Sequence, residues 1–335
     1  MPILDNEIVW RPAALQSDTL PAQNGGRMTF SQLVSGVKNN LFPDVSQAER
    51  LAGAVKWRKA FIHINSAQDT ALLNVRLFID ALTPAGDFVT FTPGTPTDTE
   101  QQIAGRPYGI GALQQASSSG ATQLLITAEH AEYATLTPFR TGDLIRVSDR
   151  PSTGGSGNEE WVLITAVSYD AANVTLELAA PLSNAYAPGV TLISSVWQSA
   201  AIAGGFTNPV LTSSTGQLDT GTQGNLIAHN KGAIAEHWTL TFLDATSFTV
   251  SGVSLGSLPA PGSITADSSP INPATNSPYF TIKAASWSGV FQAGDQLTFE
   301  TTPAAIPVWY RRQVPAGTFS LANDVASLAL HGESA

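Results

Sequence analysis

The chain contains no cysteine, so it can form no disulfide, thiolate nucleophile or Cys-ligated zinc site. Charged residues are also scarce, at 13% of the 335 residues, where soluble domains carry about 25%. Hydrophobic residues nevertheless make up 43%, which argues against an intrinsically disordered chain. The net charge of −10 argues against a nucleic-acid partner, because phosphate binding depends on clustered Lys and Arg.

Membrane and targeting signals are missing as well. The longest uncharged stretch, residues 178–218, is interrupted throughout by Pro, Asn, Ser, Thr and Gln, so we expect no membrane insertion. The first ten residues carry Asp5 and Glu7 where a signal peptide has basic residues, and nothing there predicts secretion.

Strand signals dominate what is present. Residues 73–80 alternate apolar and polar side chains, as in a half-buried strand, and 28 Gly and 21 Pro supply many turns. Helix signals are confined to a capping box from Ser46 to Glu49, which Gly53 ends, and to an apolar pattern over residues 30–40. We therefore predict a mainly β fold of two or three antiparallel sandwich or barrel modules with one or two short N-terminal helices.

Turn-rich boundaries divide the predicted strands into three regions. Residues 1–105 are expected to form a β-sandwich with the short helices, and this is the expected docking domain. Residues 106–198 predict a small barrel or sandwich. Residues 199–335 predict a C-terminal β module, which begins with a loop or linker over residues 199–231 that is rich in Gly, Ser, Thr and Gln.

An F-x-x-G-D pattern occurs twice, at residues 139–143 and 291–295, each time just before a predicted strand. Gly favours the positive φ of a turn, and Asp can accept a hydrogen bond from a neighbouring backbone N–H. The repeat is compatible with duplication of one β module or with independent use of the same turn, and the second interpretation is favoured.

The strongest catalytic motif is G-x-S-x-G at residues 252–256, with Asp267 and His331 following in the order of an α/β-hydrolase triad. That motif requires a strand that turns directly into a helix. Pro259 and Pro261 follow here, so we interpret the motif as a turn. A phosphate-binding P-loop is also excluded, because the sequence has no Gly-Lys dipeptide. We predict no catalytic residue and no cofactor site, and thus no enzyme.

Metal ligation and paired carboxylates were the remaining chemical possibilities. The closest histidines, His229 and His237, are eight residues apart and match no compact zinc spacing, and the dipeptides Glu129-His130 and Glu236-His237 do not change this. We predict no metal site. Several carboxylates lie near one another in the sequence and could serve a glycosidase, although an acidic loop edge is the favoured interpretation: Asp143, Asp149, Glu159, Glu160 and Asp170.

Two clusters combine cations with aromatic residues, which is the composition of interface anchors. We predict that they contact an acidic partner; the alternative is a strand that packs Val55 and Trp57 while its cations face water. The candidate interface residues are Arg50, Lys56, Trp57, Arg58, Lys59, Trp309, Tyr310, Arg311 and Arg312.

Several segments resemble structural proteins of tailed bacteriophages, of the Mu-like and Pseudomonas contractile-tailed type. In the N-terminal part these are NEIVWRP (residues 6–12), SDTLPAQNGGRM (17–28), NNLFPDVSQAER (39–50) and KWRKAFIHI (56–64). In the C-terminal part they are EHWTLTFLDATSFTVSG (236–252), residues 277–295 and VWYRRQVPAG (308–317). The resemblance implies a virion protein and supplies no catalytic residue.

We therefore expect a non-enzymatic tail or baseplate protein in the phage particle, made in the host cytoplasm, that self-associates and docks to other tail proteins. Scarce charge fits surfaces that neighbouring subunits cover. The alternative is a tail-fibre module that binds a host carbohydrate or receptor through Trp161, Trp197, Trp287 or Trp309. A third hypothesis is a glycan depolymerase that uses one of the carboxylates.

Overall fold

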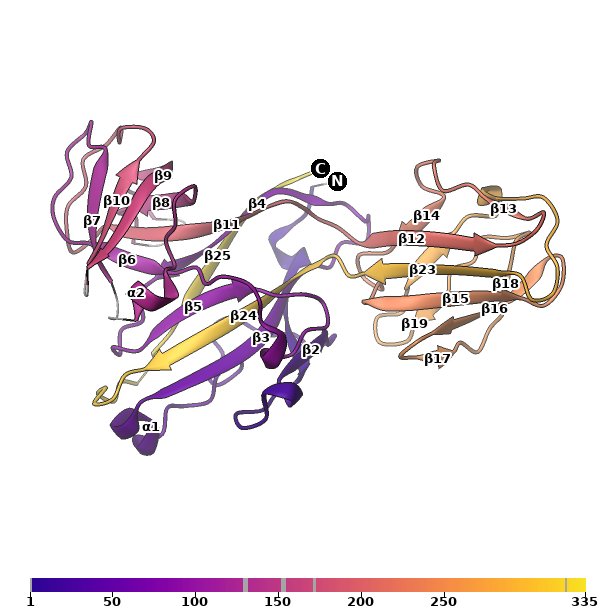
Figure 1. Cartoon of the computed structure of the whole chain (residues 1–335), viewed down its shortest axis with the longest axis horizontal. Helices are drawn as coiled ribbons and strands as arrows, with labels where there is room; N and C mark the ends of the chain where they lie inside the picture. Colours follow the sequence, from indigo (N-terminus) through magenta and orange to yellow (C-terminus); the bar gives the residue numbers. More distant parts are fainter. Residues whose placement is uncertain (1, 129–131, 152–154, 171–172, 323) are drawn as a thin grey trace.

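The computed structural model describes residues 2–128, 132–151, 155–170, 173–322 and 324–335. The molecule is elongated, with a two-part body and one separate domain at the far end, and both termini lie on the body (Figure 1). The described part contains two α-helices, both short: α1 (Gln47–Ala52) and α2 (Tyr133–Leu136). The predicted mainly β class is confirmed. None of the helices described is long and apolar enough to cross a bilayer.

The first part of the body is built on a five-stranded antiparallel sheet in the order β2-β1-β3-β24-β5. Its strands are β1 (Ile8–Leu15), β2 (Gly25–Met28), β3 (Ala54–Ile64), β5 (Phe88–Pro93) and β24 (Ala305–Val314). Three short 3-10 helices accompany it: η1 (Asp5–Glu7), η2 (Pro21–Gln23) and η3 (Glu100–Gln102). Ala60 and Ile62 of β3 pack with Val75 and Leu77 of β4 (Leu72–Ala81) in a second sheet, so this part is a sandwich.

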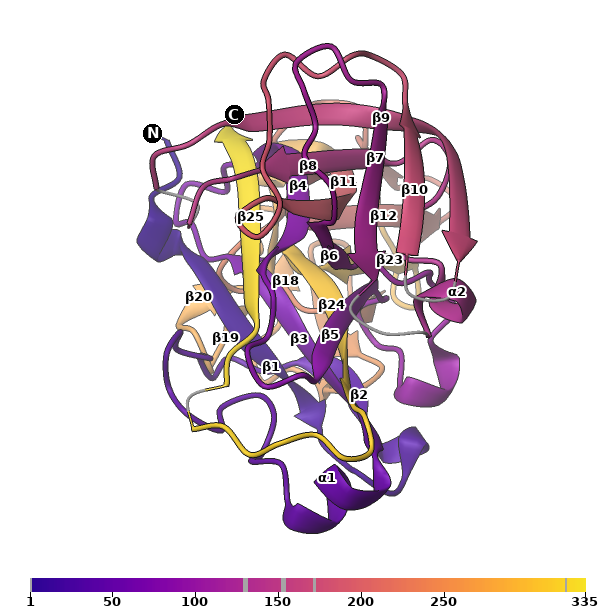
Figure 2. The same cartoon turned by 90° about the vertical axis from the view of Figure 1, so that its left-hand side faces the viewer.

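The second sheet has the strand order β25-β4-β11-β6-β7-β10-β9-β8, and its last strand, β8, also pairs with β11. Six of its strands, β6 to β11, therefore close into a barrel with its own apolar core. Figure 2 views the molecule from the body, with this sheet towards the viewer. The strands are β4 (Leu72–Ala81), β6 (Ile110–Leu113), β7 (Gln123–Ala128), β8 (Leu144–Ser148), β9 (Glu159–Asp170), β10 (Asn173–Leu178), β11 (Leu192–Ile202) and β25 (Ser327–Ser334).

The inserted domain, residues 205–302, lies at the other end of the molecule (Figure 1). Its main sheet runs β12-β23-β15-β16-β17, with β18 also paired to β16, and its core is separate from the other two. The elements are β12 (Gly205–Thr212), β13 (Gln217–Leu218), β14 (Leu226–Ala228), β15 (Glu236–Phe242), β16 (Ser247–Gly252), β17 (Gly256–Ser257), β18 (Gly262–Ser263), β19 (Ile271–Asn272), β20 (Ser277–Pro278), β21 (Phe280–Ile282), η4 (Ala284–Ser286), β22 (Trp287–Ser288) and β23 (Gln296–Thr302).

The sheets divide the C-terminal region differently from the predicted range 199–335. Strand β24 lies between β3 and β5, and β25 pairs with β4, so the end of the chain completes the N-terminal sandwich. The expected loop over residues 199–231 is also wrong, because β12, β13 and β14 lie within it. Polar composition concealed β12, whose Phe206 and Leu211 pack on the core of the inserted domain.

Local sequence signals were partly confirmed. Ser46 and Glu49 form the predicted capping box at the start of α1, and Gly53 ends the helix with φ +80°. The predicted helix over residues 30–40 is wrong: Gly36 and Asn39 have positive φ there, and the segment is formed of turns. The two F-x-x-G-D segments share their geometry, because Asp143 and Asp295 each accept a hydrogen bond from the backbone N–H three residues earlier.

Candidate functional site: the paired basic strands and the domain joint

The two predicted interface clusters lie side by side, although more than two hundred residues separate them in the sequence. Strands β3 and β24 pair so that Trp57 lies opposite Arg311 and Lys59 lies opposite Trp309. Side chains of a strand alternate between its two faces. The cations therefore divide into two groups, one on each face of the five-stranded sheet.

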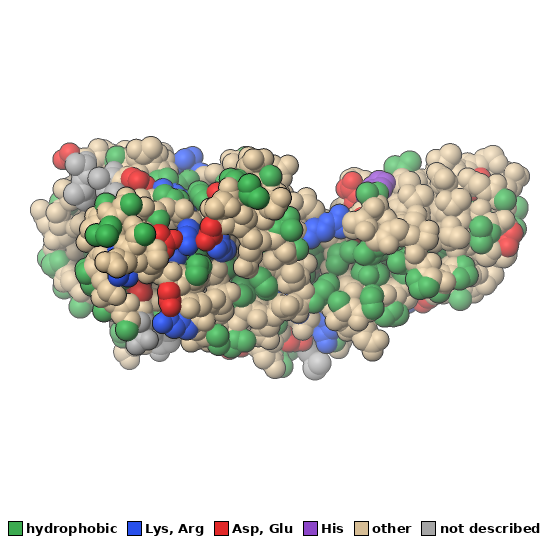
Figure 3. Space-filling model, turned by 90° about the horizontal axis from the view of Figure 1, so that it is seen from below, with side chains coloured by type: hydrophobic (Ala, Val, Ile, Leu, Met, Phe, Trp, Pro, Cys, Tyr) green, Lys and Arg blue, Asp and Glu red, His purple; other side chains and the backbone are tan. Residues whose placement is uncertain are grey.

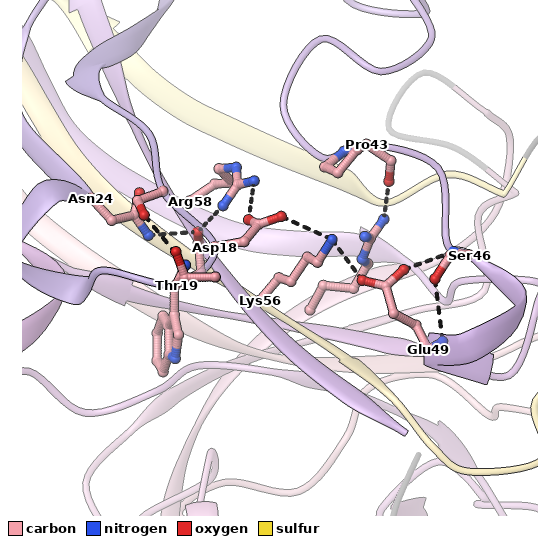
Figure 4. A network of polar contacts seen from close by, with 11 residues as sticks. Asp18, Thr19, Asn24, Pro43, Ser46, Glu49, Lys56 and Arg58 are labelled. Atoms are coloured by element: carbon pink, nitrogen blue, oxygen red, sulfur yellow. Dashed lines mark hydrogen bonds and ion pairs between the residues drawn. The ribbon is translucent and has the colours of Figure 1, made fainter. Parts of the chain in front are cut away.

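On the face that covers the sandwich core, the cations of β3 belong to a chain of ion pairs (Figure 4). Asp18 binds Arg58 and lies 3.0 Å from the Nζ of Lys56, which is 2.6 Å from Glu49. Glu49 also accepts the backbone N–H of Ser46, so the network includes the start of α1. Burial raises the pKa of Asp18, but the hydrogen bonds from Arg58 and Lys56 outweigh it and lower that pKa overall.

The same face carries a cation–aromatic contact at its end. The guanidinium of Arg312 lies 4.7 Å from the ring centroid of Phe42 and donates to the carbonyl of Pro43 over 3.0 Å. Arg50, in α1, donates to the carbonyl of Val45 over 3.0 Å. These two arginines hold the loop over residues 36–45 against the body.

On the opposite face Lys59 is enclosed. Its Nζ lies 2.6 Å from Oδ1 of Asp98 and donates to the carbonyl of Gly26 over 2.7 Å. The indole Nε1–H of Trp309 donates to Oδ2 of the same Asp98 over 2.9 Å. Burial lowers the pKa of Lys59, and the Asp98 carboxylate opposes that shift. This buried pair ties β3 and β24 to the loop before η3.

Arg311 lies on this second face and binds Glu132 over 2.9 Å and the side chain of Gln313 over 2.8 Å. Tyr310, on the core face, is buried beside Trp10, with 6.5 Å between the ring centroids. Acidic side chains of the same chain thus bind Lys56, Arg58, Lys59 and Arg311.

The alternative interpretation, in which Val55 and Trp57 pack while the cations face water, is wrong. Val55 is 45% exposed, whereas Arg58 and Lys59 are 6% and 2% exposed. Trp57 is half-buried. A contact of these residues with another protein stays a prediction. In the chain alone, Arg50 and Arg312 bind backbone carbonyls, and the other four cations already bind carboxylates.

Beside Arg312 the body contains a cavity of about 750 Å³. It is lined mainly by the segments 36–45, 318–322 and 324–328, together with Asp87, Val89, Tyr310 and Arg312. Asp324 accepts the backbone N–H of Ala85 over 3.1 Å and faces Asp87. Burial and this second carboxylate raise the pKa of Asp87 to about 6.

A second polar centre, which the sequence did not reveal, joins the body to the inserted domain. Arg11 of β1 donates its Nε–H to Nδ1 of His63 over 2.8 Å, and Nε2 of His63 lies 2.7 Å from the carbonyl oxygen of Asn230. Asp69 accepts the backbone N–H of Asn230 over 2.7 Å and lies 2.7 Å from Nδ1 of His229. We call these five residues the joint.

The G-x-S-x-G segment lies near the same boundary. Ser254 donates to the buried carboxylate of Glu236, and Arg27 of β2 bridges to both side chains at 2.7 Å and 3.2 Å. Asp267 instead binds Lys283, and His331 packs on Phe78. The motif is therefore a turn that contacts the body, and its predicted triad partners contact other residues.

The candidate carboxylates of the barrel hold its loops and strands. Asp143 is bound by both terminal nitrogens of Arg106, at 2.5 and 2.8 Å, and Glu159 accepts Nε–H of Arg146 over 2.6 Å. Glu160 accepts two backbone N–H groups, of Ser183 and Asn184, over 2.7 Å each. Burial raises the pKa of Glu160, but these hydrogen bonds lower it overall, as in a structural anion. Asp149 accepts the N–H of Asn158, and Asp170 is exposed.

The tryptophans suggested for sugar binding are largely covered. Trp309 is fully buried and Trp287 is 8% exposed, while Trp197 packs against the sandwich core. The ring of Trp161 has Arg76 4.8 Å from its centroid and His331 at 5.5 Å. Receptor binding through these rings stays a prediction.

Among the described residues there is no group of three or more His, Asp or Glu side chains arranged to hold a metal ion. Glu129 and His130 lie outside the described residues. His237 is half-exposed and lies 3.8 Å from Glu300.

Comparison of the chain with protein-family models, with curated proteins and with solved structures gave no match.

Proposed function

We propose that the chain is a non-enzymatic structural component of a bacteriophage virion, a tail or baseplate protein that self-associates and docks to adjacent tail proteins. The segments quoted above motivate the phage assignment. The geometry contributes a multi-part β scaffold in which the last two strands of the chain, β24 and β25, join the two sheets of the N-terminal sandwich. In this proposal the protein is made in the host cytoplasm and is then built into the particle.

The observation that carries the docking role is an apolar rim around the cavity of the body. Four of the residues that line this cavity are strongly exposed: Val37 (54%), Phe319 (59%), Leu321 (42%) and Val325 (59%). Exposed apolar side chains that gather beside a cavity mark interaction sites in soluble proteins. Figure 3 shows that hydrophobic and uncharged polar groups cover most of the surface seen from below, with few charges between them. Such a surface is easily desolvated by a neighbouring subunit.

Replacing Phe319 and Leu321 by Ser tests this role. Both side chains are exposed, so the variant should fold normally yet self-associate more weakly in light scattering and enter fewer particles. Val190→Ser is the matched control, because Val190 is 60% exposed on the barrel side of the body. If the variant with both rim substitutions assembled as well as the control, the proposed docking role of the rim would be contradicted.

A further inference from the structure

The inserted domain connects to the body through two short links. Residues 203–204 lie between β11 and β12, and residues 303–304 lie between β23 and β24. Within the inserted domain, the pairing of β12 with β23 begins directly after the links, because Gly205 pairs with Thr302. On the body side the two links enter different sheets, since Ile202 pairs with Leu72 and Ala305 pairs with His63. The links thus mark the place where the two parts could rotate.

In the described part of the chain, neither of the two neighbouring apolar cores extends across this boundary. The cores of the sandwich and the inserted domain are separate clusters among the described residues. The polar contacts that cross it include those of the joint, the bond from Asn230 to the carbonyl of Thr70 at 2.9 Å, and the bonds from Arg27 to Glu236 and Ser254. The relative position of the two parts therefore depends on a small set of hydrogen bonds.

His63 is central to that set and must be neutral. It is fully buried, and its Nδ1 accepts from Arg11, so its proton resides on Nε2 and is donated to Asn230. A second proton on Nδ1 would face the N–H of Arg11 at 2.8 Å and place two positive charges together. Protonation of Nδ1 therefore breaks the hydrogen bond with Arg11. The repulsion between the two cations then disfavours the ring position in which His63 binds Asn230.

We propose that the inserted domain is a movable arm, that the joint locks it to the body, and that protonation of His63 releases it. The charged group that contacts His63 is Arg11 from β1. Asp69, from the loop before β4, binds the backbone of Asn230, to which His63 bonds, and also contacts His229 from the loop after β14. Burial lowers the pKa of His63 to about 4, with Arg11 adding to the shift and the Asn230 carbonyl opposing it. This inference concerns motion within one chain and does not depend on the virion role.

The absence of cysteine allows the position of the arm to be measured directly. Ser118→Cys in the barrel and Ser214→Cys, two residues after the end of β12, place two spin labels at exposed sites on the two parts. Double electron–electron resonance then gives the distance distribution between them. At about pH 7.5 we expect one narrow peak, and at about pH 3.5 its loss to a broad distribution.

Three variants decide the outcome. His63→Gln cannot gain the charge but can still accept from Arg11 and donate to Asn230, so its peak should stay narrow at both pH values. His331→Gln changes a histidine outside the joint and should broaden in acid like the wild type. His63→Phe removes both bonds and should broaden already at about pH 7.5 while circular dichroism remains unchanged.

The test of the joint does not depend on whether the protein unfolds in acid, because the His63→Phe variant is measured at neutral pH. A narrow peak in that variant would show that the joint does not hold the arm. Equal broadening of His63→Gln and wild type in acid would show that His63 is not the releasing group.

Discussion

Lys59 and Trp309 lie opposite each other in paired strands, and both side chains bind the carboxylate of Asp98. One residue comes from the N-terminal third of the chain and the other from its end. Their shared carboxylate joins β3, β24 and the loop before η3 inside a largely buried site. This arrangement makes the pair structural, and its removal should be costly.

Lys59→Met should lower the free energy of unfolding by about 3–5 kcal/mol, because it leaves the Asp98 carboxylate buried without its cation. Urea denaturation of the full chain measures the loss. Lys38→Met is the control: Lys38 pairs with Asp44 at the surface, where its side chain is 71% exposed, and its loss should change stability by less than about 0.5 kcal/mol. Adding Asp98→Asn to Lys59→Met should recover part of the loss. No recovery would mean that the uncompensated charge is not the cause.

Gly25 packs directly against this site. Its φ is +106°, and a Cβ placed there would lie 2.5 Å from the ring of Trp309 and 2.8 Å from the carbonyl of Asp98. Gly25→Ala should therefore cost about 2–4 kcal/mol through backbone strain and overpacking. Gly36→Ala shares the positive φ but meets nothing within 4 Å, so it should cost about 1 kcal/mol. Equal losses in thermal or urea unfolding would contradict the role of the Trp309 contact.

The Asp87 carboxyl predicts a pH dependence of stability in the mildly acidic range. Its folded pKa of about 6 lies above the ordinary value of about 4, so the folded protein holds this proton more tightly than the unfolded chain. The protonated group therefore contributes about 3 kcal/mol to the free energy of unfolding below about pH 4. This contribution is lost as the pH rises to about 6. Asp87→Asn should abolish this dependence and be more stable than the wild type at neutral pH.

The control for this prediction is Asp44→Asn, which changes another carboxylate at the same cavity. That variant should keep the wild-type slope of unfolding free energy between about pH 4 and 6. If Asp87→Asn and Asp44→Asn gave the same dependence of unfolding free energy on pH, the facing carboxylates Asp87 and Asp324 would not be the source of that dependence.

The His63 imidazole predicts a dependence of the opposite sign. Its folded pKa of about 4 lies below the ordinary value of about 6.5, so the unfolded chain takes up the proton first. Stability is complete above about pH 6.5 and falls by about 3 kcal/mol as the pH decreases to about 4. Subtracting the pH profile of His63→Gln from that of the wild type isolates this contribution, and a flat difference would argue against a buried neutral histidine.

Sequence reasoning succeeded where the signal was local. The capping box of Ser46 and Glu49 and the two F-x-x-G-D turns depend on residues three apart, and both are present. The pairing of β3 with β24 is set by contacts across most of the chain, and composition alone could suggest both clusters without indicating that they meet. The joint was missed for the same reason: Asp69 and His229 are 160 residues apart, and neither belongs to a motif.

The partners of the charged residues at the candidate site could not be read from the sequence. Asp18, Glu49, Asp98 and Glu132 of the same chain bind Lys56, Arg58, Lys59 and Arg311, and the predicted contact with another acidic protein stays a prediction. A sequence shows which charges exist but not which ones the fold neutralises.

The apolar rim of the cavity, formed partly by Phe319 and Leu321, depends on the return of the chain to the N-terminal sandwich.

The central claim, a structural role in a phage particle, is tested most directly by an electron cryomicroscopy map of particles from a host that carries this gene. We expect the chain to appear in repeated copies in the tail or baseplate, with neighbouring subunits covering the rim formed by Val37, Phe319, Leu321 and Val325. A map of complete particles in which the chain has no density, together with its recovery as a free monomer from the same lysate, would contradict the account.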